Sequence, residues 1–445
     1  MYEKDLRGVK IAILTLGCKV NSYESDAMMS ELAACGAEQT DFDGKADVYI
    51  INTCSVTNIA DRKSRQMIHR AKKENPSAIV IAAGCFIQAS TEKEREALGI
   101  EGFVGNNRKN RIVDIVLECL RKKESQKAIS EIVDVLKEKE YEELENLDKA
   151  SHTRAYIKIQ DGCNRFCTYC IIPFTRGHIR SREPEDVIAE AKRLAARGYR
   201  ELVLTGIHLS SYEGYGLKSR DALLRLMEEL AETQGIERIR IGSLEPRIIT
   251  KDFAERLSKN RKVCPHFHLS LQSGSDTVLK RMNRKYDSAD YETGCRELRE
   301  VYDNPAITTD IIVGFPGETD AEFEETCAFA QKIGFSKVHV FKFSRRRGTV
   351  ADKMPDQVTE EIKNLRSRKL IAIEEGMGKA YAESFIGREQ NILIEEKEII
   401  DGKEYLTGYT ERYVRCAVPA GEHERGELVT AVGCRVKDNV LFFDH

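Results

Sequence analysis

Residues 155–170 have the sequence AYIKIQDGCNRFCTYC, in which a strand-like apolar run leads into three cysteines with the spacing C-x3-C-x2-C. Cys163, Cys167 and Cys170 lie close enough on one loop to bind three irons of a [4Fe–4S] cluster. The fourth iron would have no cysteine ligand and would be open to a substrate, as catalytic metal sites are. A zinc ribbon would instead show two C-x2-C pairs, which this sequence lacks.

Strand-like runs that alternate with helix-like segments extend on both sides of this motif, from residue 151 to residue 380. The strand–helix units indicate a partial (β/α)6 barrel, whose functional site should lie at the carboxyl ends of its strands. The expected strands are residues 155–160, 201–205, 238–242, 266–271, 307–313 and 337–343.

The first 120 residues (1–120) show the same alternation on a smaller scale, and three of their strand-like runs end at a cysteine. Continuous runs of Val and Ile predict a Rossmann-like parallel sheet covered by helices on both faces. Because parallel strands end at the same edge of a sheet, Cys18, Cys54 and Cys85 should lie near one another. The spacing alone fits two interpretations equally well: a second metal cluster, or three buried thiols that pack as small hydrophobic side chains.

Two further segments complete the predicted α/β multidomain organisation. Residues 121–150 are rich in Glu and Lys, which indicates an exposed helix or linker between the two α/β units. Residues 386–445 contain short strand-like runs separated by turn signals such as Asp401-Gly402, which predicts a small antiparallel β-barrel.

The composition is that of a globular protein without a membrane-spanning segment. The formal net charge of −3 argues against a strongly basic nucleic-acid-binding protein but leaves room for a local basic face. No apolar run approaches the ~20 residues needed to cross a bilayer, and no signal segment follows the charged N-terminus. We therefore expect a cytoplasmic protein with no membrane partner. In that reducing compartment, 13 cysteines indicate metal ligands or buried thiols rather than disulfides.

The C-x3-C-x2-C motif resembles that of the radical S-adenosylmethionine enzymes. In that family the open iron binds S-adenosylmethionine, and an electron from the cluster cleaves the cofactor to a 5′-deoxyadenosyl radical. The stretches 15–26, 52–57 and 84–85, which hold the three strand-end cysteines, resemble the N-terminal domain of the radical S-adenosylmethionine methylthiotransferases. The resemblance implies that these cysteines bind an auxiliary [4Fe–4S] cluster, whose open iron carries the sulfur to be transferred. The resemblance continues through residues 158–163, 204–208, 271–275 and 310–318.

The barrel must also hold S-adenosylmethionine, because the protein orients the cofactor whose chemistry it uses. Residues at or near the expected strand ends are the candidates for these contacts. For the glycines among them the alternative is an ordinary turn, and for the two carboxylates it is a structural ion pair or a cap. The candidates are Gly206, Ser243, Glu245, Gln272, Ser273, Asp310 and Gly314.

The methylthiotransferases divide into branches that modify isopentenyladenosine in tRNA, threonylcarbamoyladenosine in tRNA, or an aspartate of a ribosomal protein. The start GCKVN, residues 17–21, most resembles the threonylcarbamoyladenosine branch. This resemblance implies an enzyme that modifies C2 of N6-threonylcarbamoyladenosine next to the anticodon, at tRNA position 37. The other two branches remain alternatives. A non-catalytic, metal-containing RNA-binding protein is a further alternative, against which the cysteine spacing argues.

The segment 386–445 resembles the RNA-binding TRAM domain of this family. It nevertheless has eight Lys and Arg against twelve Asp and Glu, a net charge of −4, which departs from the basic character expected of an RNA-binding module. The resemblance further implies an electron donor and a sulfur donor as partners, in addition to the tRNA substrate.

Overall fold

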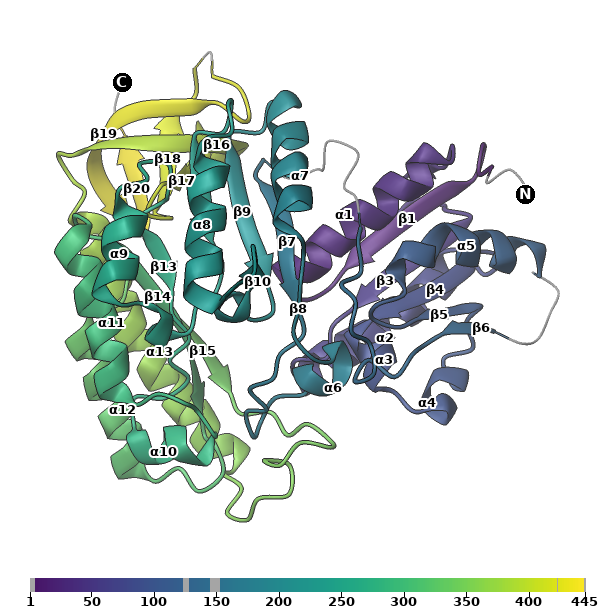
Figure 1. Cartoon of the computed structure of the whole chain (residues 1–445), viewed down its shortest axis with the longest axis horizontal. Coiled ribbons are helices and arrows are strands. Elements are labelled where there is room, and N and C mark those ends of the chain that lie inside the picture. Colours follow the sequence, from purple (N-terminus) through teal and green to yellow (C-terminus); the bar gives the residue numbers. More distant parts are fainter. Residues whose placement is uncertain (1–4, 123–127, 145–152, 422, 444–445) are drawn as a thin grey trace.

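The computed structural model describes residues 5–122, 128–144, 153–421 and 423–443, and it confirms the predicted α/β multidomain fold. Figure 1 shows three sheet-based units along the chain: an N-terminal open sheet (purple to blue), a central incomplete barrel (teal to green) and a small C-terminal barrel (yellow). Within these described residues, no helix is long and apolar enough to span a bilayer.

The N-terminal unit is a six-stranded sheet in the order β2-β1-β3-β4-β5-β6, and all its strand pairs are parallel. Every residue of the central strands β3 (Val48–Thr53) and β4 (Ile79–Gly84) is buried, because helices α1 and α5 pack on one face and α2 and α3 on the other. The other elements are β1 (Lys10–Thr15), β2 (Glu38–Gln39), β5 (Gly102–Val104), α1 (Lys19–Ala34), α2 (Asn58–Glu74), α3 (Cys85–Ala89), α4 (Glu92–Glu96) and α5 (Ile112–Arg121).

The charged stretch 121–150 is only partly described, because residues 123–127 and 145–152 lie outside the described residues. Its strand β6 (Ile129–Glu131) pairs with β5 and so extends the N-terminal sheet. Farther along, the Tyr141 hydroxyl donates a hydrogen bond of 2.8 Å to the carbonyl oxygen of Lys158 in the central barrel. The described part of this stretch therefore contacts both α/β units.

The central unit is an incomplete barrel of parallel strands, as predicted, with β12-β9-β7 in one sheet and β13-β14-β15 in another. Isolated parallel bridges, Ile239 with Val263 and Leu244 with Leu269, join the two sheets. One set of alternating strand side chains packs against the surrounding helices and the other set faces the barrel interior. The strands are β7 (Ala155–Asp161), β9 (Glu201–Gly206), β12 (Arg238–Ile241), β13 (His266–His268), β14 (Ala306–Val313) and β15 (Lys337–Lys342), and β8 (Arg180–Ser181) runs antiparallel to β7.

Helices surround this barrel on its outer side (Figure 1). Helix α6 follows the C-x3-C-x2-C loop, and α13 leads from the central barrel to the C-terminal one. The bounds are α6 (Ile172–Arg176), α7 (Pro184–Ala196), α8 (Ser219–Ala231), α9 (Lys251–Ser258), α10 (Asp276–Arg281), α11 (Ser288–Val301), α12 (Asp320–Ile333) and α13 (Glu360–Glu383), with a short hairpin of β10 (Glu213–Gly214) and β11 (Leu217–Lys218).

The C-terminal unit is a closed barrel in the strand order β16-β17-β18-β20-β19. Its pairs are antiparallel, as predicted, except that β18 runs parallel to β20. Phe385, Ile392, Leu406 and Leu441 lie in its core. The strands are β16 (Glu389–Ile400), β17 (Lys403–Thr410), β18 (Arg415–Pro419), β19 (Leu428–Lys437) and β20 (Val440–Phe443).

A buried ion cluster joins the amino-terminal ends of the central strands to the C-terminal barrel. Glu201, at the start of β9, is fully buried, and its carboxylate lies 3.1 Å from Arg154 Nε, 2.9 Å from Arg240 Nε and 3.4 Å from Arg238 Nη1. Arg238 also donates a hydrogen bond of 2.6 Å to the carbonyl oxygen of Asn391 in β16. The cluster therefore fixes the C-terminal barrel at the end of the central barrel opposite the strand carboxyl ends.

We predict that Glu201→Gln lowers the free energy of unfolding by about 3–5 kcal/mol, because it removes the carboxylate that three buried guanidinium groups share. Urea denaturation measures the change. The matched control is Glu237→Gln, which breaks an exposed ion pair with Arg200 and should cost less than about 1 kcal/mol. Equal, small losses in the two variants would contradict the stabilising role of the Glu201 cluster.

Candidate functional site

Three cysteines lie just beyond the carboxyl ends of neighbouring strands in the N-terminal sheet. The registers of β1 with β3 and of β3 with β4 bring all three strand ends to one edge. Cys18 precedes α1, Cys54 follows β3, and Cys85 begins α3. A Cβ at Gly17 would lie 2.9 Å from the Cβ of Cys54, so the first two loops approach as closely as a glycine permits. Burial and the neighbouring Cys85 and Cys18 raise the pKa of the Cys54 thiol to about 11.

The C-x3-C-x2-C loop leaves β7 at the carboxyl-terminal edge of the central barrel. Arg284 Nη1 donates to Cys167 Sγ at 3.1 Å, and the backbone N–H of Arg165 donates to Cys163 Sγ at 3.5 Å. Burial, and then the neighbouring Cys167, raise the pKa of the Cys170 thiol to about 12. Because hydrogen-bond donors toward sulfur stabilise the thiolates that hold iron, the loop fits a [4Fe–4S] cluster.

The side-chain amide of Asn106 links the strand-end cysteines to α6, the helix that follows the C-x3-C-x2-C loop. Asn106, 1% exposed, donates from Nδ2 to Cys85 Sγ at 3.4 Å and to the carbonyl oxygen of Thr175 at 2.8 Å. Thr175 lies in α6, directly after the C-x3-C-x2-C loop. The Asn106 Oδ1 accepts a hydrogen bond of 2.8 Å from Lys109 Nζ. Asn106 therefore joins the strand-end cysteines to α6 across the boundary between two units.

Beneath this contact lies a fully buried ion network. Glu24 of α1 accepts hydrogen bonds from Lys158 Nζ at 3.0 Å, from Arg176 Nη1 at 2.8 Å and from Lys109 Nζ. Asp161 at the end of β7 lies 2.7 Å from Lys158 Nζ and 3.1 Å from Arg176 Nη1. Burial alone would raise the pKa of Glu24, but Arg176 and the two lysines hold it well below its usual range. Three cations and two carboxylates thus leave a local excess of positive charge.

The Arg176 guanidinium carries part of this charge toward the strand-end cysteines. Its Nη2 donates to Asn21 Oδ1 at 2.8 Å, and the same oxygen lies 3.7 Å from Cys18 Sγ. Burial raises the pKa values of the Cys18 and Cys54 thiols, and the charge of Arg176 opposes that effect. A buried cation beside three thiols fits an anionic iron–sulfur cluster held by them.

Among the candidates for S-adenosylmethionine contacts, Glu245 lies beside the C-x3-C-x2-C loop. Its Oε2 is 2.5 Å from Arg165 Nη2 and 3.1 Å from His208 Nε2. Burial would raise the pKa of Glu245, but the hydrogen bond with His208 and the charge of Arg165 hold it below its usual range. Gly206 ends β9, and Ser243 is exposed after β12, so both lie at the same edge of the barrel.

The remaining strand-end candidates differ in their surroundings. Ser273 is fully buried, with its hydroxyl 3.1 Å from that of Thr326, and a Cβ at Gly314 would lie 2.3 Å from Lys363 Cγ. Both Ser273 and Gly314 are therefore closely packed against the protein. Gln272 has a φ of 73°, a backbone conformation that costs energy in a residue with a side chain and that often occurs at functional sites.

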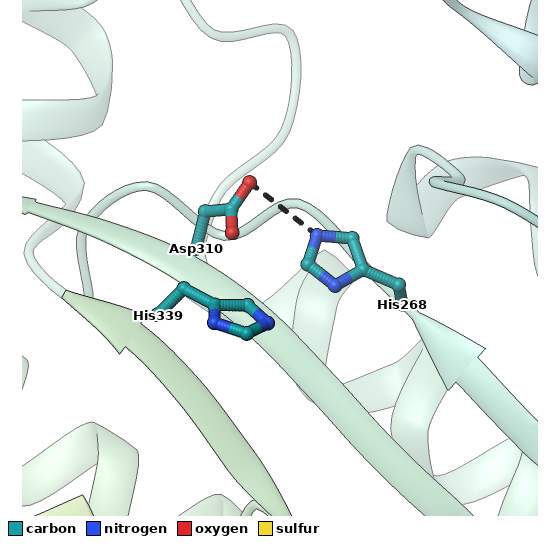
Figure 2. A group of neighbouring side chains, drawn as sticks. All are labelled: His268, Asp310 and His339. Carbon is teal, nitrogen blue, oxygen red and sulfur yellow. Dashed lines mark ion pairs between the residues drawn. The ribbon is translucent and has the colours of Figure 1, made fainter. Parts of the chain in front are cut away.

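Asp310 belongs to a group of three side chains on the inner face of the barrel, shown in Figure 2. His268 of β13, Asp310 of β14 and His339 of β15 point toward one another, and one ligand atom from each lies within 4.8 Å of the others. His268 Nε2 is 3.4 Å from Asp310 Oδ2, and its Nδ1 is 3.0 Å from Thr308 Oγ1. Burial lowers the pKa of His339, so its imidazole is neutral near pH 7. The sequence patterns pointed to Asp310 but to neither histidine.

Lys19 extends from the first turn of α1 toward this inner face. Part of its side chain is exposed to solvent. Desolvation by the protein around it and the charges of Arg240 and Arg154 lower its pKa to about 8. Both Lys19 and His268 lie close enough to the buried His266 to contribute to the lowering of its pKa. Lys19 therefore connects the strand-end cysteines with the polar interior of the barrel.

We predict that Glu24→Gln destabilises the protein by about 3–5 kcal/mol, because it leaves buried cations without their shared carboxylate. The folded-state pKa of Glu24 is depressed, so its stabilising contribution is present above its unfolded-state pKa and is lost as the pH falls. The wild-type free energy of unfolding should therefore decline below about pH 5, and the variant should decline less steeply. Urea denaturation across this pH range measures both slopes. Glu228→Gln, which breaks an exposed pair with Arg256, is the control, and parallel slopes for wild type and Glu24→Gln would contradict the prediction.

The cysteine-bearing units match two family models. Residues 157–330 match the radical SAM superfamily, and residues 10–105 match the uncharacterized protein family UPF0004. Among solved structures, the radical S-adenosylmethionine methyltransferase TsrM of Kitasatospora setae is similar with a TM-score of 0.57, covering 88% of this chain and 81% of that one. Because the two share 15% sequence identity, this likeness concerns the fold alone.

Curated relatives match over nearly the whole length. The threonylcarbamoyladenosine tRNA methylthiotransferase MtaB of Bacillus subtilis is 41% identical, covering 94% of this chain and 92% of the relative. The tRNA-2-methylthio-N(6)-dimethylallyladenosine synthase of Clostridium novyi is 36% identical, covering 97% of this chain and 92% of the relative. The family resemblance noted in the sequence is confirmed: this chain belongs to the radical S-adenosylmethionine tRNA methylthiotransferase family.

Proposed function

We propose that this chain methylthiolates C2 of N6-threonylcarbamoyladenosine at position 37 of tRNA, giving 2-methylthio-N6-threonylcarbamoyladenosine. Relatives named for that substrate, from Bacillus subtilis, Aquifex aeolicus, Thermotoga maritima and Chlamydia pneumoniae, are 34–41% identical over more than nine-tenths of this chain. Relatives named for dimethylallyladenosine are 33–36% identical. Among these relatives, the highest identity, 41%, is with one named for the threonylcarbamoyl substrate.

The polarity of the inner face of the barrel favours one of the two substrates over the other. Lys19, His268, Asp310 and His339 line it, and Phe341 is a large exposed apolar side chain on the same strand as His339. A dimethylallyl group is wholly apolar, whereas a threonylcarbamoyl group has a carboxylate, a hydroxyl and amide groups. Because an apolar ligand would cover these polar groups without offering them hydrogen-bond partners, this lining favours the threonylcarbamoyl group.

The two groups of cysteines would hold two [4Fe–4S] clusters. Membership of the family implies S-adenosylmethionine and one cluster. We assign that cluster to Cys163, Cys167 and Cys170, and a second, auxiliary cluster to the strand-end cysteines Cys18, Cys54 and Cys85. When bound, the first cluster supplies the electron that cleaves S-adenosylmethionine, and the second carries the sulfur. Support for the second site comes from the mutual proximity of its thiols and the positive charge of Arg176 beside them.

The chain's own residues orient the reactants. We assign contacts with S-adenosylmethionine to Glu245, Gly206, Ser243 and Gln272, and the position of Glu245 beside Arg165 of the cysteine loop supports this assignment. In this proposal, Asn106 and the Glu24 network fix the position of the sulfur-bearing site relative to the radical-forming site, because they join the strand-end cysteines to α6. The chemistry also requires an electron donor and a sulfur donor as partners.

Mass spectrometry of tRNA nucleosides from cells with and without this gene tests the proposed function. We expect loss of 2-methylthio-N6-threonylcarbamoyladenosine, with accumulation of the form that lacks the methylthio group. Accumulation of dimethylallyladenosine would instead identify the other tRNA substrate. An unchanged nucleoside profile would refute the proposed function and direct attention to the ribosomal-protein aspartate.

We predict that Cys167→Ala abolishes both S-adenosylmethionine cleavage and methylthiolation, whereas Cys54→Ala retains part of the cleavage and forms no methylthio product. The reason is that the two thiols belong to different proposed clusters. Production of 5′-deoxyadenosine and of modified RNA measures the two steps. Cys295→Ala, which replaces a buried thiol of α11 outside both groups, is the control and should retain both activities. Wild-type product yield from Cys54→Ala would refute the sulfur-carrying site.

A further inference from the structure

The position of the reacting carbon limits where the modified side chain of the substrate can lie. In adenine, C2 and the exocyclic N6 flank N1 on the same edge of the ring. A base that presents C2 to the sulfur-bearing site therefore places its N6 substituent close to that site as well. Residues that distinguish a threonylcarbamoyl group should lie next to the strand-end cysteines and face the barrel interior.

Lys19 occupies such a position. It directly follows Cys18, and its neighbours Arg154 and Arg240 lie at the amino-terminal end of the central barrel. Those two guanidinium groups are already paired with Glu201. Among the residues that the structure describes, the Lys19 ammonium has no hydrogen bond or ion pair of its own. An anionic group of a ligand could therefore pair with the Lys19 ammonium on the inner face.

The group His268, Asp310 and His339 supplies the complementary hydrogen-bonding capacity. Asp310 is one-third exposed and has no Lys or Arg partner among the described residues; its ion-pair contact is with His268. His339 is exposed beside it, and Thr308 fixes the ring of His268. Figure 2 shows the carboxylate of Asp310 beside the His268 ring, with the His339 ring close to both. A carboxylate accepts hydrogen bonds from hydroxyl and amide groups, and an imidazole can donate or accept.

We propose that Lys19, Asp310 and His339 form the subsite that binds the threonylcarbamoyl group of the substrate. Lys19 binds the threonyl carboxylate, and Asp310 and His339 bind the hydroxyl and amide groups. This inference rests on the proposed function and deepens it, because it names the residues that make the enzyme select the charged substituent. These are specificity-determining residues rather than participants in the radical chemistry.

Three anticodon stem-loop RNAs test the subsite on the holoenzyme. The first contains threonylcarbamoyladenosine, the second has its threonyl carboxylate converted to an amide, and the third contains glycylcarbamoyladenosine, which keeps the carboxylate but lacks the hydroxyl. Equilibrium Kd values and kcat/KM are measured for each. Production of 5′-deoxyadenosine in the absence of RNA shows whether the cofactor chemistry remains intact.

We expect Lys19→Gln to lose about tenfold to a hundredfold in affinity and kcat/KM for the acid RNA, as expected when a charge-assisted hydrogen bond is removed. It should show little further loss on the amide RNA, which already lacks the charge. Asp310→Asn should lose more on the threonyl than on the glycyl RNA. Lys251→Gln, an exposed lysine on the outer helix α9, is the control and should match the wild type.

The possible failures are distinguishable. If wild-type enzyme does not methylthiolate the acid RNA at all, the proposed function is wrong. If it does, but Lys19→Gln retains the wild-type ratio between acid and amide RNAs, only the subsite is wrong. Two imidazoles and a carboxylate are also a common set of ligands for a transition metal. One zinc or iron ion per chain beyond the clusters, lost in His339→Ala, would show a metal site there and overturn the assignment.

Discussion

The buried carboxylate of Glu24 determines how the N-terminal sheet sits on the central barrel. It projects from α1 and is neutralised by Lys158 of β7, Arg176 of α6 and Lys109, so one charge joins parts of the chain more than a hundred residues apart. An unpaired charge in such surroundings costs several kcal/mol, which makes other arrangements of the two units unfavourable. The orientation that satisfies Glu24 is also the one that places the strand-end cysteines near α6, the helix that follows the C-x3-C-x2-C loop.

The same charges that hold the units together also affect the chemistry. Arg176 brings positive charge to the strand-end thiols, and Asn106 donates both to the sulfur of Cys85 and to Thr175 of α6, the helix that follows the C-x3-C-x2-C loop. Charge and hydrogen bonds near sulfur set the reduction potential of an iron–sulfur cluster. Architecture and cluster environment therefore depend on one set of contacts. At the far end of the barrel, the Glu201 cluster holds the C-terminal barrel in place and pairs with Arg154 and Arg240. Within the described residues, neither a hydrogen bond nor an ion pair holds the neighbouring Lys19 ammonium.

Local sequence patterns predict much of this fold, because apolar periodicity reports strands and helices and parallel strands end at one edge. Cys18, Cys54 and Cys85 could be grouped on that basis alone. Contacts between distant segments leave no local pattern in the sequence. From the sequence alone, Glu24 and Arg176 could therefore not be distinguished from other charged residues. For the same reason β6 could not be distinguished within the charged stretch 121–150. His268, Asp310 and His339 come together because three neighbouring strands point these side chains to the same face, which no single segment of the sequence reveals. Ser273 and Gly314 are closely packed at strand ends.

The central claim is that two separate cysteine sites each bind a [4Fe–4S] cluster. Mössbauer spectroscopy of anaerobically prepared, iron-57-labelled protein tests it most directly. The wild type is compared with a variant in which Cys163, Cys167 and Cys170 are replaced by Ala. The account predicts two [4Fe–4S] clusters per chain in the wild type and one in the variant. A single cluster in the wild type, or none in the variant, would contradict it.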